Sequence, residues 1–337
     1  MQKTGVVVLN WNGKDSVVEC LDSLQSQSSK SEIIVIDNGS VDGSLGLIKE
    51  KYPDIELIVN PVNVGFAAGV NQGISKAIEL GLDYVALFNN DAVADKKWLE
   101  NLVNCLGSQT EVGIATCKFI SLDKSFIDST GDLYTIWGLP YPRGRKEAVS
   151  DSYDDLVDIF GASGGASLYR VSMLKEIGLF DKDFFAYYED IDISFRAQLA
   201  GWKVKYVPSA IAYHQIGATS SKIKGFTTYQ TTKNLPWIIV KDVPFGLWFK
   251  ILPRFSLAYI SFIASAVARK QGWFAFKGLF VSLFLLPKKL LERRKIQSTR
   301  KSTTSYIDSI IVHDLPPNAT KLRHLRSIWW KFTFKNK

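Results

Sequence analysis

Three polar residues, Asn89-Asn90-Asp91, follow the apolar run 84–88, which is rich in strand-forming residues. A buried strand that ends here places Asp91 at its carboxyl end, where open α/β sheets bind their ligands. A carboxylate with amide oxygens beside it suits a hard divalent cation that holds a diphosphate. The alternative is a strand that ends in an Asn/Asp turn, whose side chains bond to their own backbone.

A second group of carboxylates is formed by Glu189, Asp190 and Asp192. Apolar residues at i, i+4 and i+8 from Ile191 predict a helix that begins near Asp190 and buries that face. The helix dipole favours carboxylates in the first turn, but their mutual repulsion raises the pKa of at least one of them, which suits a general base. An ordinary acidic first turn with capping is the alternative. Two roles stay open for Arg196 on the same side of the helix, pairing with these acids or contacting phosphate.

Polar residues also end the predicted strand 32–36, where Asp37 and Asn38 follow. Asp37 at a strand tip could accept hydrogen bonds from a base or a ribose. An Asx turn with helix capping by Asp37 and Asp42 is the alternative.

Glycine recurs at every fourth residue within 63–74, at Gly65, Gly69 and Gly73. Because glycine weakens a helix, three of them imply a close backbone approach, either to a neighbouring helix or to a ligand. A helix N-terminus near Asn63 would favour an anionic ligand.

Further candidates lie in the middle of the chain. The small residues Ser163–Ser167 suit a wall that a bulky ligand approaches closely. His214 follows the predicted strand 204–207, and a lone histidine becomes a ligand candidate only when a metal lies nearby. Residues 121–158 are expected to form irregular structure or short strands that cover a site.

The order of the predicted elements is that of an α/β protein with a mostly parallel sheet. A buried strand at 5–9 leads into the turn Asn10-Trp11-Asn12-Gly13, a helix is expected over 15–25, and the next strand covers 32–36. Such a unit is right-handed, so the polar ends of both strands lie on one edge of the sheet. The turn lacks the glycine-rich fingerprint of nicotinamide enzymes, which argues against a dehydrogenase of the usual kind.

Length and charge indicate one large domain with an appendage. The 337 residues carry a net charge of +8, but residues 221–337 hold 22 Lys/Arg against four Asp/Glu, so the C-terminal part is expected to face an anionic surface. Cys20, Cys105 and Cys117 lack metal-ligand spacing, which indicates reduced thiols in a cytosolic protein. No signal peptide is expected, and the chain is predicted to stay on the cytoplasmic side.

From Asn234 onward, aromatic residues alternate with lysines and arginines. The longest charge-free run, 255–268, has fourteen residues, whereas spanning a bilayer takes about 20, so these segments are predicted to lie in the membrane interface. Prolines at 236, 244, 253 and 287 are expected to divide the segments. A basic cluster suits anionic lipid head groups: Lys288, Lys289, Arg293, Arg294 and Lys295.

Two other interpretations of this region remain. The aromatics could be buried in a soluble helical subdomain that packs on the first domain or on a second subunit, and a homo-oligomer therefore stays open. A nucleic-acid partner is not expected, because the aromatics come with aliphatic stripes.

Taken together, residues 5–217 resemble glycosyltransferase family 2, the inverting nucleotide-sugar enzymes with the GT-A fold. The strand ends within 6–13 and 36–44 look like the nucleotide-binding strand ends of the family. Residues 63–74 are similar to the Asn-x-Gly-Phe-x-x-Gly-x-Asn-x-Gly segment of its bacterial rhamnosyltransferase-like branch. Asn89-Asn90-Asp91 stands at the place of the Asp-x-Asp metal motif, but with Asn89 at its first acidic position. Residues 189–192 stand at the place of the catalytic-base motif.

The resemblance implies a role for individual residues. Asp190 is expected to be the catalytic base, and Asp91 to hold a divalent cation, Mg²⁺ or Mn²⁺. His214 is expected to assist Asp91, since in some family members a histidine about this far past the base completes the metal site. The residues expected at the nucleotide sugar are Asn10, Asp37, Asn38, Asn63, Asn71, Asn90 and Arg196.

The resemblance also implies an architecture and a function. A GT-A domain is expected over 1–225, followed by an amphipathic, basic helical region at the membrane interface over 226–337. The expected reaction transfers a sugar from a nucleotide-sugar donor to a polyprenyl-diphosphate-linked glycan, in polysaccharide or O-antigen synthesis at the cytoplasmic face of the membrane. Deoxythymidine-diphosphate rhamnose is the expected donor, and UDP-hexose or UDP-GlcNAc is the alternative.

Two rival functions are weighed against this expectation. A nucleotidyltransferase would use a glycine-rich basic loop early in the chain, which residues 10–16 do not supply. A non-catalytic membrane scaffold with a degenerate transferase domain is the other rival, and Asn89 is the residue that favours it.

Overall fold

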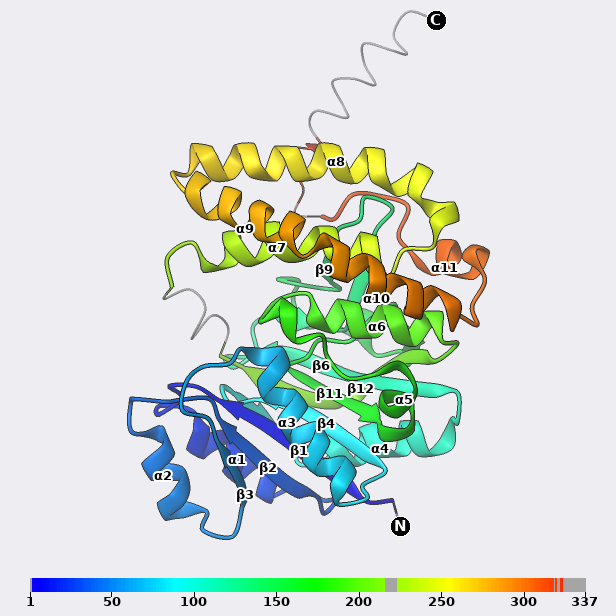
Figure 1. The fold of residues 1–337 in the computed structure, drawn as a ribbon. Coiled ribbons are helices and arrows are strands. Elements are labelled where there is room, and N and C mark those ends of the chain that lie inside the picture. Colours follow the sequence, from blue (N-terminus) through cyan, green and yellow to red (C-terminus); the bar gives the residue numbers. More distant parts are fainter. Residues whose placement is uncertain (1, 216–222, 318, 320–321, 324–337) are drawn as a thin grey trace, which may run out of the picture.

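A computed structural model describes residues 2–215, 223–317, 319 and 322–323, and Figure 1 shows its fold. A mixed sheet forms the centre, with the strand order β10-β12-β6-β11-β4-β1-β2-β3, and β5 and β7 pair at its side. Its strands are β1 (Thr4–Asn10), β2 (Glu32–Asp37), β3 (Glu56–Val59), β4 (Tyr84–Asn89), β5 (Ala92–Ala94), β6 (Val112–Ser121), β7 (Ile127–Ser129), β10 (Val157–Asp158), β11 (Ala166–Arg170) and β12 (Lys203–His214). Strands β8 (Asp132–Tyr134) and β9 (Pro140–Pro142) pair with each other in a separate sheet.

Some helices cover the two faces of this sheet, and those of the C-terminal region stack beyond them at one end of the molecule (Figure 1). They are α1 (Val17–Gln25), α2 (Ser44–Lys51), α3 (Phe66–Glu79), α4 (Trp98–Ser108), α5 (Val171–Ile177), α6 (Glu189–Leu199), α7 (Phe226–Lys241), α8 (Phe245–Ala268), α9 (Gly272–Phe284), α10 (Leu286–Ser298) and α11 (Thr304–Ile310), with short 3-10 turns η1 (Asp151–Tyr153) and η2 (Lys182–Phe184).

The predicted parallel unit is present at the amino-terminal side of the sheet. β1 runs parallel to both β2 and β4, and Asn10 lies beside Asp37 at the carboxyl ends of their strands. β11 runs antiparallel to both β4 and β6 and separates this parallel half from the β6–β12 pair. Polar residues that end β1, β2 and β4 are therefore gathered at one edge of the sheet.

Each face of the sheet buries one hydrophobic core. Residues of α1, α2 and α4 pack on one face, with Trp98 fully buried. Residues of α3, α5 and α6 pack on the other, among them Val70 and Ile193. All three cysteines are buried and free, as expected, and burial raises the pKa of each thiol.

The glycines at every fourth position in α3 are explained by packing on the sheet. A Cβ at Gly69 would lie 2.5 Å from the side chain of Leu9, and one at Gly73 would lie 2.5 Å from Val7. Only glycine lets the helix approach the strands this closely. The helix begins at Phe66, so the expected N-terminus near Asn63 is three residues too early.

A third core joins α6 to the C-terminal helices. The predicted stripe Ile191, Phe195 and Leu199 is buried, and it packs with residues of α7, α8 and α11 rather than against the sheet. Trp237 of α7 is fully buried in this core. The chain from Phe226 onward therefore shares its core with the helix that carries Asp190.

Two expectations about the C-terminal region are wrong. Pro236 and Pro253 lie inside α7 and α8 and do not divide the segments. The basic cluster is partly buried, because Lys289 is fully buried among Asp181, Asp183 and Glu292 of the same molecule. Lys288 forms an ion pair with Asp183, and Arg293 donates to the carbonyls of residues 240 and 243.

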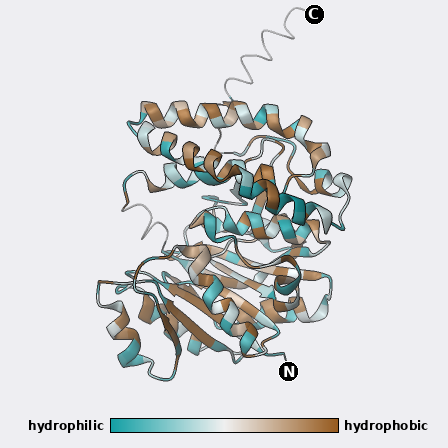
Figure 2. Cartoon of the chain, viewed as in Figure 1, coloured by the Kyte–Doolittle hydropathy of each residue, from teal (hydrophilic) through white to brown (hydrophobic). Residues whose placement is uncertain are grey.

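Helices α8 and α9 are rich in apolar residues, as the brown segments in Figure 2 show. Phe249, Trp273 and Phe284 are 80%, 75% and 74% exposed, while the inner side of α8 is buried. Among the described residues one helix, α8, is long and apolar enough to cross a membrane by length and composition. α8 is longer than the charge-free run 255–268 because it also includes Lys250 and Arg254.

Candidate active site

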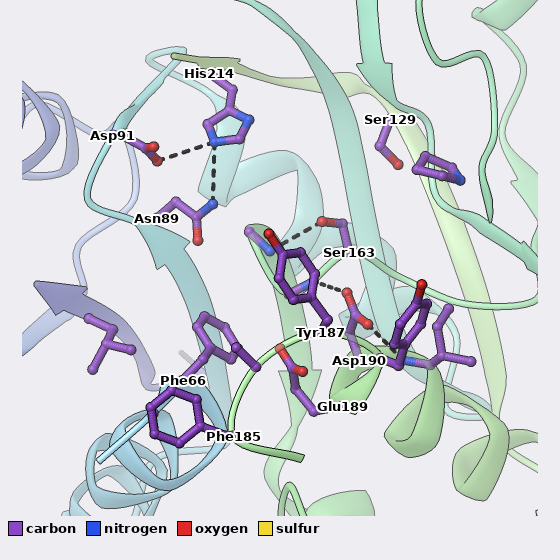
Figure 3. A pocket seen from close by; sticks show the side chains of 18 of the residues that line it. Phe66, Asn89, Asp91, Ser129, Ser163, Phe185, Tyr187, Glu189, Asp190 and His214 are labelled. Carbon is purple, nitrogen blue, oxygen red and sulfur yellow. Dashed lines mark hydrogen bonds and ion pairs between the residues drawn. The ribbon is translucent and has the colours of Figure 1, made fainter. Parts of the chain in front are cut away.

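A cavity of about 730 Å³ lies at the carboxyl ends of β1 and β4 and is closed on the other side by α6 and by the segment before it. Six of the predicted site residues line this cavity: Asn38, Asn63, Asn90, Asp91, Asp190 and His214. Figure 3 shows Asp91 and His214 on one side and Asp190 with Glu189 on the other. The structure thus brings together residues that are up to 176 positions apart in the sequence.

The metal-ligand candidates meet because β5 pairs with the end of β12. In this pairing His214 lies opposite Ala92, next to Asp91. The Nε2 atom of His214 is 3.2 Å from Oδ1 of Asp91 and 3.4 Å from Nδ2 of Asn89. The imidazole also stacks on the ring of Phe119 at a centroid distance of 4.6 Å, which fixes its plane.

Asp128 of β7 holds the other nitrogen of this imidazole. Its Oδ2 atom is 2.7 Å from Nδ1 of His214, and Arg145 pairs with its second oxygen at 3.1 Å. Burial lowers the pKa of His214, but the bonds to Asp128 and Asp91 outweigh this effect and raise the pKa to about 9. A carboxylate on the outer nitrogen is the usual arrangement behind a metal-ligating histidine. Once Nε2 of His214 has lost its proton, Asp91 and His214 offer an oxygen and a nitrogen that fit a divalent cation.

Asp190 lies in the first turn of α6, as the helical periodicity predicts. Its Oδ1 accepts a hydrogen bond from the backbone N–H of Ile191 at 2.9 Å, and its Oδ2 from Gly164 at 3.3 Å. A Cβ at Gly164 would lie 3.7 Å from that of Asp190 but only 3.2 Å from the ring of Phe66, so the glycine avoids crowding this ring. Burial raises the pKa of Asp190 above the usual value, against the two hydrogen bonds, which lower it. A carboxylate of raised pKa at the cavity wall can accept a proton.

Two further carboxyl groups lie near Asp190. Burial raises the pKa of Glu189 and of Asp132 well above the usual value, and the charge of Asp190 raises both further. Oε2 of Glu189 has no hydrogen-bond partner among the described residues. Because neighbouring carboxylates repel one another, the group resists ionisation of all three carboxyl groups together.

The donor-side residues form a connected polar network. Asn10 donates from Nδ2 to Oδ1 of Asp37 at 2.9 Å and accepts at its Oδ1 from Asn90 at 2.9 Å. Asn38 donates to Oδ1 of Asn63 at 3.0 Å. Asn38, Asn63 and Asn90 line the cavity, whereas Asn10 and Asp37 are fully buried beneath it.

The alternative role foreseen for two strand-end acids is also present. Oδ2 of Asp37 accepts from the backbone N–H of Ser40 at 3.0 Å, and Oδ1 of Asp42 accepts from that of Ser44 at 3.0 Å. Asp37 therefore forms the Asx turn that the sequence analysis gives as the alternative. It would affect donor binding only through its hydrogen bond with Asn10.

Besides Asn10 and Asp37, two further predicted donor residues do not line the cavity. Asn71 bonds the backbone of Phe180 through both its amide atoms, at 2.7 and 3.0 Å. Of the two roles left open for Arg196, the structure shows pairing: Nε donates to Asp192 at 2.9 Å, and the other nitrogens donate to the carbonyls of residues 177–179. These donors are used within the protein, so the expected contact of Arg196 with phosphate is not supported.

No pattern in the sequence indicates Asp128 or Asp132 as a site residue. Both lie in the stretch 121–158, which was expected only to cover a site, and neither stands in a recognisable spacing to His214 or Asp190. They reach the cavity because β7 pairs with β6, and β8 follows directly.

A third carboxylate group, Asp181, Asp183 and Glu292, is close enough to hold an ion but lies outside this cavity. Nζ of Lys289 occupies its centre, at 2.6 to 3.1 Å from all three residues. An ammonium group therefore already neutralises this cluster, and we assign no metal to it.

Comparison with known sequences identifies the family. A model of the family described as "Glycosyl transferase family 2" matches residues 5–178. An N-acetylglucosaminyl-diphospho-decaprenol L-rhamnosyltransferase of Mycobacterium tuberculosis is 26% identical over 204 residues, which cover 54% of this chain and 66% of that protein. A poly-beta-1,6-N-acetyl-D-glucosamine synthase of Staphylococcus epidermidis is 26% identical over 217 residues, which cover 62% of this chain and 49% of that protein. The chain thus spans about two thirds and half of these relatives.

Solved structures show the same fold. The mannosyltransferase PcManGT from Pyrobaculum calidifontis, in complex with GDP-Man and Mn²⁺, aligns with a TM-score of 0.52 at 15% identity, covering 89% of this chain and 86% of its own. GalNAc-T7 with UDP, GalNAc and Mn²⁺ aligns with a TM-score of 0.56 at 16% identity, covering 71% and 48%. The predicted GT-A fold is confirmed, and since the family model matches more than half of the chain, the protein belongs to glycosyltransferase family 2.

Proposed function

We propose that this protein is an inverting glycosyltransferase that moves a sugar from a nucleotide-diphosphate donor to a hydroxyl of a lipid-linked glycan in cell-surface polysaccharide synthesis. The observation that carries the proposal is the single cavity that has Asp190 on one wall and Asp91 with His214 on the other. Because both groups line the same cavity, Asp190 can act on the acceptor hydroxyl while Asp91 and His214 act at the diphosphate of the donor.

In the proposed reaction Asp190 accepts the proton of the acceptor hydroxyl. The acceptor oxygen forms a bond to the anomeric carbon while the bond from that carbon to the diphosphate oxygen breaks, and the leaving nucleoside diphosphate takes the electron pair. One displacement inverts the anomeric carbon. The raised pKa of Asp190 strengthens it as a base relative to an exposed aspartate.

Asp91 and His214 would hold the divalent cation, Mg²⁺ or Mn²⁺, and that cation supplies positive charge against the leaving diphosphate. Asp128 holds Nδ1 of His214 and so directs Nε2 toward Asp91. Asn89 stands beside the imidazole and keeps a neutral amide where the family motif has an acid.

Asn38, Asn63 and Asn90 are proposed to contact the nucleotide, supported from below by Asn10 and Asp37. For the sugar we propose rhamnose carried on deoxythymidine diphosphate, because one relative is named a rhamnosyltransferase. UDP-GlcNAc is the second candidate, because another relative is named a poly-N-acetyl-D-glucosamine synthase.

A polyprenyl-diphosphate acceptor is proposed from the position of the apolar surface. Tyr187 and Phe226 line the cavity near the start of α7. A Cβ at Gly225 would lie 2.2 Å from the ring of Phe274, so the start of α7 packs tightly on α9, which carries exposed aromatic residues. The acceptor side of the cavity therefore adjoins the apolar face of α8 and α9.

We further propose that residues 1–225 form the GT-A domain and residues 226–337 a membrane-associated region. The protein would lie peripherally at the cytoplasmic face of the membrane. The segment 245–284, which forms α8 and α9, also carries the exposed basic residues Arg254, Arg269, Lys270 and Lys277. Apolar area combined with positive charge favours binding to anionic membranes.

The test is calorimetric donor binding, with and without manganese, on a panel of dTDP-rhamnose, UDP-GlcNAc and UDP-glucose, followed by a transfer assay with a polyprenyl-diphosphate-linked GlcNAc acceptor. We expect metal-dependent binding of one donor. Asp91→Ala should weaken that binding. Asp190→Asn should keep it and lower transfer by about 10³-fold, as the loss of a general base does.

The matched control is Asp54→Asn, an exposed acid after α2 that should leave both measurements unchanged. Unchanged turnover in Asp190→Asn would remove Asp190 from the mechanism. A protein that neither binds nor consumes any donor, with the acceptor and manganese supplied, would instead be the non-catalytic scaffold.

A further inference from the structure

The segment directly before the proposed base has an unusual backbone. Phe185, Tyr187 and Tyr188 have φ angles of 65°, 68° and 73°. This left-handed region is unfavourable for residues with a bulky side chain, and strained conformations of this kind persist only where the surroundings impose them. Tyr188 is the residue that precedes α6, so the strained segment sets the position at which the helix of Asp190 begins.

Asn234 of α7 imposes this conformation from one side. Its side chain is fully buried, and Nδ2 lies within hydrogen-bond distance of three carbonyls of the segment, those of Phe184 at 3.0 Å, Ala186 at 3.0 Å and Tyr187 at 2.8 Å. In the described residues, none of these carbonyls accepts a hydrogen bond from a strand of a β-sheet. One amide group thus gathers three acceptors that the left-handed turns point toward α7.

Lys233, the preceding residue, extends the contact. Nζ donates to the carbonyls of Asp183 at 2.8 Å and Phe184 at 3.1 Å, and its side chain is only 4% exposed. Burying a lysine costs free energy unless its N–H groups are hydrogen-bonded. The carbonyls of the segment provide these bonds, which an apolar residue at this position could not make.

The donor side of the cavity confines the segment from the opposite direction. The backbone N–H of Ala67 donates to the carbonyl of Phe185 at 3.2 Å. A Cβ at Gly65 would lie 2.6 Å from the ring of Phe185, so this ring fills the space beside the glycine. Figure 3 shows Phe185 next to Phe66 at the edge of the cavity, with Tyr187 and Glu189 further along. The strained segment is therefore held between α3 and α7.

We propose that Asn234, assisted by Lys233, is a positioning residue for catalysis: it fixes the strained segment 184–188 and through it places Asp190 against the backbone N–H of Gly164. This inference rests on the proposed role of Asp190 as the base. It follows that α7 completes the active site; like Asp190 and His214, it lies after residues 5–178, which the family model matches. Asn234 itself touches neither donor nor acceptor, since it does not line the cavity.

The experiment compares Asn234→Ala and Asn234→Asp with the control Gln230→Ala. Gln230 is a buried amide in the same helix, and it makes no hydrogen bond to the segment in the described residues. Donor affinity is measured by calorimetry, turnover by release of nucleoside diphosphate, and the melting temperature by circular dichroism. We expect turnover to fall about 10- to 100-fold in both Asn234 variants, since small displacements of a catalytic group have effects of this size. Donor affinity should stay within about twofold, and Gln230→Ala should lose about as much stability but keep its turnover.

A double variant separates positioning from a general structural role. In an Asp190→Asn background the group to be positioned is absent, so adding Asn234→Ala should lower the residual turnover by less than about twofold. An equal loss in both backgrounds would overturn the inference. So would wild-type turnover in a folded Asn234→Asp.

Lys233 provides the second variant if substitutions at Asn234 prevent folding. Lys233→Met removes both hydrogen bonds of Nζ and should lower turnover without weakening binding of the nucleotide sugar. Lys233→Arg keeps N–H groups that can donate and should recover part of the loss. Equal turnover in the two variants would contradict the inference. Failure of the proposed function would show differently, as unchanged turnover in Asp190→Asn or as no donor binding or consumption by the wild type.

Discussion

Replacement of Lys289 by methionine tests the largest difference between the sequence interpretation and the structure. The sequence interpretation places this lysine in a basic cluster that contacts lipid head groups. In the structure its side chain is fully buried, and Nζ lies 2.6 Å from Asp181, 2.7 Å from Asp183 and 3.1 Å from Glu292. Methionine keeps most of the length of the side chain and removes the charge, so the substitution isolates the ion pairs.

The expected loss follows from the burial of this cluster. Removing one partner of a buried ion pair costs about 3–5 kcal/mol, because the other charge is left without compensation. The side chains of Asp183 and Glu292 are 16% and 28% exposed, so water can reach them after the substitution. Lys241 also still contacts Asp181 at 2.5 Å. We therefore expect about 3 kcal/mol, the lower end of the range. In a chain of this size that corresponds to about 6 °C in melting temperature.

The assay combines thermal unfolding with flotation on vesicles that contain phosphatidylglycerol. Lys295→Met is the matched control, since Lys295 lies in the same helix and is exposed. Lys289→Met should melt about 6 °C lower than the control and bind vesicles as the wild type does. Unchanged stability together with lost vesicle binding would refute the reasoning and restore the lipid-binding interpretation. Acid should also destabilise the wild type. Lys241 and Lys289 outweigh the effect of burial and lower the pKa of Asp181, and the stability that comes from this lowered pKa is lost as the pH falls.

Three further results are expected. The pKa of Glu189 is raised in the folded protein, so the protonated side chain favours folding at low pH and this stability is lost as the pH rises through that pKa. In urea unfolding, Glu189→Gln should therefore be more stable than the wild type at pH 8 but not at pH 4. Gly65→Ala should lower both melting temperature and turnover, because Gly65 has a φ of +89° and an added methyl group would meet a ring at 2.6 Å; equal values for variant and wild type would contradict the close packing. Replacing both Trp273 and Phe280 by serine should weaken flotation on anionic vesicles without lowering the melting temperature, and Val41→Ser, at a 90% exposed site, is the control. Full vesicle binding by the double variant would argue against the apolar face as the membrane contact.

Surface substitutions are preferable to truncation for testing membrane binding. A deletion from residue 234 onward removes Asn234 and Trp237, both fully buried. It would also uncover the apolar stripe of α6 that packs on the C-terminal helices. Loss of vesicle binding or turnover in such a fragment would therefore report damage to the core, not the loss of a membrane anchor.

Much of the fold and part of the site could be predicted from local pattern. The buried strands before Asn10, Asp37 and Asp91 were recognised because a strand that is covered on both faces reads as a continuous apolar run. Parallel connectivity then places their polar ends on one edge of the sheet. Asp190 was located because helical periodicity and an acidic first turn are both local properties of the chain. The four motifs in order indicated the family, and the family model and the fold comparisons confirm it.

Roles that depend on a partner from a distant element were decided by the tertiary structure alone. Asp128 reaches His214 only because β7 pairs with β6, and Lys289 is buried only because Asp181 and Asp183 lie beneath α10. Asn234 bonds a segment that is 47 to 50 residues away in the sequence. The spacing of apolar and polar residues along the chain predicts only the geometry of single helices and strands, because their periods are local. Whether a charged or polar side chain is solvated, paired or aimed at a site depends on which elements pack together, and hydrophobic burial across the whole chain determines that packing.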